Sequence, residues 1–195
     1  MSLGIAVAIR ADLGTSPIAA LPTVLSFATP ISVGIYVILL NLIFFLVQPL
    51  VLRSKFERFQ LIQIPITFAF GLMLDLGVYL TQWITPASYL AQWGWTLVSV
   101  VLMAIGVYVE TQPRLAYLPG NGVLVAVAMV QNKLSFGTVK ILLDALLLAI
   151  AVAASLVLFN GLEGVGEGTV FAALGVGMLL RLINSISLRR TKRVA

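Results

Sequence analysis

Polar residues that could bind a ligand gather at two short breaks between apolar segments of this chain. The first break, "RADLGTSP", covers residues 10–17, and the second break, "YLPGNG", covers residues 117–122. Ser, Thr, Asn and Gly suit the position before a helix, and Pro suits its first turn. Each break is therefore predicted to present a helix N-terminus, whose free N–H groups favour an anion or a polar group. The residues expected to bind a solute at the two breaks are Gly14, Thr15, Ser16, Pro17, Pro119, Gly120, Asn121 and Gly122.

Two ionisable residues lie inside a long apolar segment of the second half. Asp144 is about eight residues into the segment 136–159, and Lys140 comes one helical turn earlier. Ionisable residues within membrane spans are rare and mark functional sites. In one interpretation Asp144 takes up a proton or cation and Lys140 modulates it; in the other, both form an ion pair that reaches the membrane surface. Asn41 holds the matching place in the first half, and it is predicted to share the binding site.

Further charged residues are candidates for gating or for holding the breaks in place. Asp75 either lines the cavity or pairs with Arg10 at its outer mouth. Arg10 and Asp12 lie at the first break, and Glu110 and Arg114 lie at the corresponding place before the second. These two pairs either fix the short helices or form a gate.

Composition identifies the kind of protein that must position these residues. Of the 195 residues, 61% are hydrophobic and 10% are charged, whereas a soluble domain carries roughly a quarter charged residues. The chain has no Cys and no His, which excludes disulfides, thiolate or imidazole metal sites and a Ser–His nucleophile. We expect no cofactor, no metal and no enzymatic activity. The net charge of +5 arises from short loops and the tail, which is typical of the positive-inside rule and not of nucleic-acid binding.

Apolar segments of about membrane-spanning length recur along the chain. Six of them are assigned to membrane spans, and two of 12 or 13 residues reach only ~18–20 Å, too short to cross alone. The first segment is also short, and we expect its span to extend upstream. The segments are about 1–9, 17–28, 33–52, 60–80, 93–110, 119–131, 136–159 and 168–188.

The two halves of the chain resemble each other at a constant offset of 102 or 103 residues. "SLGIAV" matches "AIGVYV", Pro17 matches Pro119, and the glycine at 34 matches the one at 137. A sustained offset indicates an internal duplication, with chance similarity between Gly-, Leu- and Ala-rich helices as the alternative. We predict one transmembrane domain over 1–195, with repeat one at about 1–82 and repeat two at about 92–190.

Charge predicts how the repeats are oriented. If each short helix enters the membrane and returns, a repeat crosses three times and the second repeat is inverted. The basic residues at 53–58 and in the tail then lie in the cytoplasm, while the segments 81–92 and 160–167 lie outside. The predicted fold is an all-α polytopic membrane protein of two inverted-topology repeats, each of three transmembrane helices with a broken or re-entrant short helix after the first.

At these motifs the chain resembles the YczE/YyaS-like bacterial membrane proteins, which are similar to the YitT family. The resemblance lies in "G-x-A…A-D-L-G-x-S-P" at Gly4–Pro17, "P-G-(D/N)-G" at Pro119–Gly122, and "G-x-G-T-V" at Gly166–Val170 followed by Gly175. Family members often carry Asp where this chain has Asn121, and they usually begin with a basic segment that is missing here. The resemblance implies a multi-pass protein of the bacterial inner membrane with duplicated halves.

The sequence favours a transporter or channel-like protein for a small polar or anionic solute, with its site near the midplane between the two breaks. Its expected partners are the lipid bilayer and that solute, with a homo-oligomer as a further option and no nucleic acid. The alternative is a non-transporting accessory protein that binds a partner protein or lipid, in which the breaks pack in a dry core. A lipid-modifying enzyme comes third, because no carboxylate partner for Asp144 or Asp75 is visible.

Overall fold

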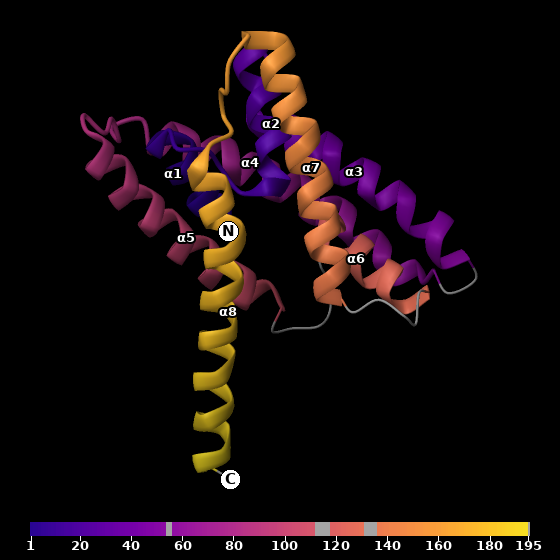
Figure 1. The fold of residues 1–195 in the computed structure, drawn as a ribbon. Coiled ribbons are helices and arrows are strands. Elements are labelled where there is room, and N and C mark those ends of the chain that lie inside the picture. Colours follow the sequence, from indigo (N-terminus) through magenta and orange to yellow (C-terminus); the bar gives the residue numbers. More distant parts are fainter. Residues whose placement is uncertain (54–55, 112–117, 131–135, 195) are drawn as a thin grey trace.

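The computed structural model describes residues 1–53, 56–111, 118–130 and 136–194, and these residues form helices and no strand (Figure 1). The elements are α1 (Ser2–Ala11), α2 (Pro17–Ala28), α3 (Val33–Leu52), the 3₁₀ helix η2 (Arg58–Ile62), α4 (Gln63–Leu80), α5 (Tyr89–Thr111), α6 (Pro119–Val130), α7 (Phe136–Phe159) and α8 (Glu167–Val194). Within the described residues, the apolar segments predicted from the sequence correspond to these helices, with 60–80 covering η2 and α4 and with most boundaries displaced by a few residues.

Four stretches of the described chain are long and apolar enough to cross a membrane. They are Val33–Leu52, Arg58–Leu80, Tyr89–Glu110 and Thr138–Phe159. Helices α1 and α2 are shorter, with 10 and 12 residues. The prediction of an all-helical membrane protein is confirmed at this level.

The first break is formed by backbone that leaves the helical region twice. Asp12 ends α1 with φ = +62°, and Gly14 has φ = +98°, which favours a residue without a side chain. Ser16 is extended (φ −64°, ψ 150°), and Pro17 then begins α2. The predicted start of the short helix at this proline is confirmed.

The core lies where α1 packs between α4 and α5. Ile5 of α1, Leu74 of α4 and Met103 of α5 are almost completely buried there. Gly4 lets α1 approach α5 closely, because a Cβ at this position would lie 2.7 Å from the backbone nitrogen of Met103. Around this core α2 packs on α7, α3 packs on α6 and α4, and α5 packs on α8.

The last two helices of the first half, α3 and α4, pack differently from the last two helices of the second half, α7 and α8. Helices α3 and α4 touch at Gly34 and Gly71, where each glycine leaves room for the backbone of the other. Helices α7 and α8 diverge below the loop that joins them, and within the described residues they pack far less closely than α3 and α4 (Figure 1). The C-terminal part of α8 continues past the other helices (Figure 1).

Candidate functional site

A cavity of about 110 Å³ lies in the middle of the helices, and both breaks contribute to its lining. Most of the remaining lining is apolar and includes Ile5 of α1, Phe70 of α4, Met103 of α5 and Val176 of α8. The residues predicted from the sequence that line this cavity are Ser16, Pro17, Asn41, Gly120, Asn121, Lys140 and Asp144. The tertiary structure thus brings together, around one cavity, residues that lie more than 100 positions apart.

The first break is held by the start of α8. The Leu13 carbonyl oxygen accepts a hydrogen bond from the N–H of Gly168 (2.8 Å). A Cβ on Gly166 or Gly168 would lie 2.6 Å from the same oxygen, so both glycines permit this approach. A side chain at Gly14 would in turn collide with Thr169. The sequence analysis used the glycines at 166 and 168 only as part of a family motif, and it missed their contact with the first break.

The hydroxyl groups of the first break have no partner among the described residues. Ser16 occupies the N-cap position of α2 as expected, but its side chain makes no capping hydrogen bond. The Thr15 and Ser16 hydroxyls are both buried and unpaired in the described part of the chain. Neither oxygen accepts from the following turn, so neither side chain caps α2.

The second break, in contrast, is pinned by side chains. Oε1 of Glu110 accepts from the N–H of Leu118 (3.0 Å) and from Nδ2 of Asn121 (3.1 Å). Oδ1 of Asn41 accepts from the N–H of Gly120 (3.2 Å). Asn41 therefore lines the cavity while closing the N-terminus of α6, and Glu110 fixes the second break.

A buried amide pair contacts the second break, and sequence reasoning missed it. Gln48 and Gln63 exchange two hydrogen bonds of 2.8 and 3.1 Å, and Gln48 also donates to the Pro119 carbonyl oxygen (3.3 Å). A Cβ on Gly122 would lie 2.7 Å from Nε2 of Gln48, so this glycine permits the contact. The available signal was the presence of two amides inside otherwise apolar spans.

Lys140 and Asp144 form an ion pair at the edge of the cavity. Nζ of Lys140 lies 2.8 Å from Oδ2 of Asp144, and their side chains are 44% and 17% exposed. The predicted pairing four residues apart is confirmed. Because both residues also line the cavity, the ion pair and a role in binding are compatible.

Asp75 does not line the cavity, and its carboxylate instead bonds to the start of α3. Its carboxylate accepts from the Ser32 hydroxyl (2.6 Å) and from the N–H of Gly34 (2.7 Å), so it caps the N-terminus of α3. The expected pairing with Arg10 is wrong, because the Arg10 guanidinium donates to the Val78 carbonyl oxygen (3.0 Å). The first N–H groups of α3 have no acceptor within their own helix, and the Asp75 carboxylate supplies one.

The other gating candidates lie outside the cavity. Arg10 and Asp12 line a separate open depression beside Gln92, and among the described residues they form no ion pair with each other. Arg114 lies outside the described residues, so its pairing with Glu110 stays a prediction.

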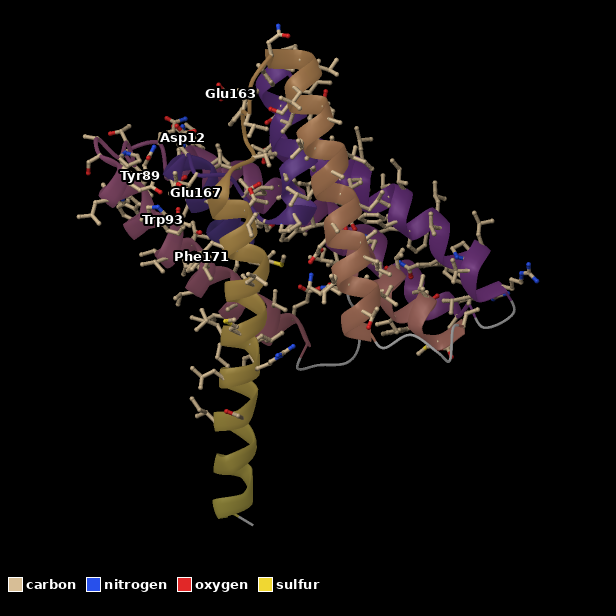
Figure 2. All side chains as sticks on the ribbon, in the orientation of Figure 1. Asp12, Tyr89, Trp93, Glu163, Glu167 and Phe171 are labelled. Atoms are coloured by element: carbon tan, nitrogen blue, oxygen red, sulfur yellow. The ribbon has the colours of Figure 1, made fainter. Side chains whose placement is uncertain are left out.

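An aromatic and acidic cluster joins the beginnings of α5 and α8 near Asp12 (Figure 2). The Tyr89 hydroxyl donates to Oε1 of Glu167 (2.5 Å), and the ring centroids of Trp93 and Phe171 lie 5.3 Å apart. Glu167 is the first residue of α8, so this cluster fastens α8 to α5 at the end where α8 also holds the first break.

Comparison with family models identifies the family to which the sequence is similar. The model of a family described as a family of unknown function, DUF6198, matches residues 1–185. No curated protein and no solved structure matches the chain.

Proposed function

We propose that this chain, which belongs to the DUF6198 family, is a membrane transporter or channel-like protein for a small polar or anionic solute. The solute binds in the cavity between the first and second breaks. The observation that carries the proposal is that two helix N-termini, one from each half of the chain, line the same cavity between the helices. Helix N-termini that face a site near the midplane are how many transporters hold polar solutes in an apolar surrounding.

The packing of the helices supports a duplicated architecture for this transporter. Suppose that the four helices α1, α2, α3 and α4 correspond in order to α5, α6, α7 and α8. The packed pair α2/α7 then corresponds to the pair α6/α3, and the packed pair α1/α4 corresponds to the pair α5/α8. All four pairs pack closely, and α1–α5, which corresponds to itself, does so too. The proposed arrangement is two inverted repeats whose short helices α2 and α6 are re-entrant. The pair α7–α8 departs from the correspondence, because it packs far less closely than α3–α4, and both of its helices contribute to the lining of the cavity.

The distribution of basic residues supports a location and an orientation. We place the protein in the bacterial inner membrane, as the resemblance to YczE/YyaS-like proteins implies. The segment 53–58 and the basic C-terminal tail face the cytoplasm in this proposal, because short cytoplasmic segments carry the excess of Lys and Arg.

Thiol labelling tests whether water reaches the cavity. The chain contains no Cys, so single cysteines at Ser16 and Asn121 report without background. We expect a membrane-impermeant thiol reagent to modify both Ser16→Cys and Asn121→Cys from at least one side of the membrane. Ala6→Cys, fully buried and outside the cavity lining, is the matched negative control, and the exposed Ser88→Cys is the positive one.

Protection of both positions from both sides would contradict the proposal. That result would favour the accessory protein, in which the breaks pack in a dry core. Labelling of both positions would be followed by flux measurements in vesicles, with Asp144→Asn as the variant expected to change the flux.

A further inference from the structure

We infer that the solute is a small organic monoanion, a short-chain carboxylate, whose charged group binds at the N-terminus of α2 with Ser16 and Lys140. This inference rests on the proposed function and names the substrate class of the same cavity. The aliphatic part of the solute packs against the apolar lining contributed by α1, α5 and α8.

The two helix N-termini are not equivalent, and only one is open to a ligand. At α6, the N–H of Leu118 is taken by Glu110 and the N–H of Gly120 is taken by Asn41. At α2, the side chain of Ser16 makes no capping bond and Pro17 has no N–H, while the Ser16 carbonyl oxygen accepts from the N–H groups of Ala19 and Ala20 (both 2.9 Å). Within the described residues no side chain therefore accepts from the first turn of α2, whereas side chains accept from two N–H groups at the start of α6.

Ser16 supplies the second observation that points to a ligand. Ser16 is 8% exposed and is one of the residues that line the cavity, and its hydroxyl is buried without a partner among the described residues. A buried polar group without a hydrogen bond is costly, and in native proteins such a group calls for a bound partner. A hydroxyl donates readily to a carboxylate oxygen, so an anionic solute satisfies it.

The correspondence between Asn41 and Asp144 explains how α2 stays open. Asn41 lies on α3, which packs on α6, and bonds the α6 N-terminus. Asp144 holds the corresponding position on α7, which packs on α2, but its carboxylate pairs with Lys140. Lys140 carries three N–H donors, so it retains donors for a solute while holding Asp144.

Charge and size restrict the solute further. One lysine, offset by Asp144, and a helix N-terminus worth about half a charge suit a single negative charge and not a dianion. The cavity of about 110 Å³ has room for several water molecules, which fits a solute of a few carbon atoms. The apolar lining offers few partners to a hydrated inorganic ion, so it favours an organic tail.

The test measures binding of sodium propionate to the purified full chain by the shift of its thermal unfolding midpoint. Propionamide is the neutral isostere, and sodium chloride is the inorganic control at equal ionic strength. We expect saturable stabilisation by propionate and none by propionamide or chloride. Equal stabilisation by propionate and propionamide would overturn the inference, because charge would not be recognised.

Variants assign the binding to the named residues. Ser16→Ala and Lys140→Gln are each expected to weaken propionate binding about tenfold or more, since each removes one hydrogen bond to a charged group. Lys140→Arg, which keeps the charge, is expected to retain most of the affinity. The controls are Arg181→Gln, an exposed cation outside the cavity lining, and Ser26→Ala at the other end of α2; both should stay within about twofold of the parent.

Asp144→Asn keeps the inference falsifiable if the other variants fold poorly. Removing the carboxylate frees Lys140, so propionate is expected to bind several-fold more tightly, a gain that misfolding does not produce. Unchanged or weaker binding in a folded Asp144→Asn protein would contradict the arrangement.

The thiol-labelling experiment distinguishes failure of the carboxylate inference from failure of the proposed function. If Ser16→Cys and Asn121→Cys are modified but acetate, propionate and butyrate all fail to bind, the carboxylate is wrong and the solute pathway stands. If both cysteines are protected, the proposed function itself fails.

Discussion

Several polar side chains inside this chain complete the ends of helices. Asp75 closes the N-terminus of α3 through Ser32 and Gly34, and Asn41 closes that of α6 through Gly120. In an apolar surrounding, N–H groups at a helix start have no water to bond, so side chains from neighbouring helices must accept from them. An ionisable residue within a span is therefore not by itself a coupling site.

Substitution of Asp75 tests this assignment. Asp75→Asn loses the charge that strengthens both bonds, so the free energy of unfolding is expected to fall by about 1–2 kcal/mol. Propionate affinity should not change, because Asp75 lies outside the cavity lining. Thermal unfolding and the propionate titration measure the two quantities, with the exposed Asp12→Asn as the matched control. A loss of affinity at unchanged stability would return Asp75 to the binding site.

At the level of helices, small residues decide which pairs approach closely. A Cβ on Gly34 would lie 2.5 Å from Cγ of Asp75 and would also collide with the Gly71 carbonyl oxygen. Close helix pairs in membranes depend on such residues, because lipid tails are as apolar as the helices themselves. The interface between α3 and α4 therefore tolerates no added atom at this point.

Alanine at two glycines separates packing from helix propensity. Gly34→Ala is expected to destabilise the protein by about 1–3 kcal/mol through overpacking. Gly94→Ala in α5 is the control, since its Cβ would meet nothing within 4 Å, and it should be neutral or stabilising by up to about 1 kcal/mol. The free energy of unfolding of each purified variant, measured in detergent, checks both expectations. Equal destabilisation by the two variants would show that the close approach of α3 and α4 is not what Gly34 provides.

The whole molecule is asymmetric in a way that bears on transport. The pair α3–α4 is closed at Gly34 and Gly71, whereas its counterpart α7–α8 diverges (Figure 1). Lys140 and Leu143 of α7 and Val176 of α8 line the cavity on this open side. In the proposed inverted repeat, closing one pair while opening the other would change the side from which the cavity is reached.

The orientation of the loops tests the inverted repeat directly. We expect an impermeant thiol reagent added outside intact cells to modify Glu163→Cys and Gln82→Cys, and to modify Arg58→Cys only after permeabilisation. All three positions are exposed in the structure, so burial does not explain a difference. If α2 and α6 both crossed the membrane fully, positions 58 and 163 would lie on the same side. Labelling of Arg58→Cys and Glu163→Cys from the same side would therefore contradict the inverted arrangement.

The helices, their approximate bounds and the position of both breaks were predictable from the amino-acid sequence. These features are local, because apolar runs set the helices, and Pro17, Pro119 and Gly14 set where the backbone is interrupted. The partners of the polar groups were not predictable in this way: the cap by Asp75, the anchoring of the second break by Glu110, and the N-terminus of α2 without a side-chain cap depend on how the helices pack. Helices that are apolar on most faces carry little amphipathic signal for their rotation, so the neighbour that a polar side chain meets depends on packing between distant segments.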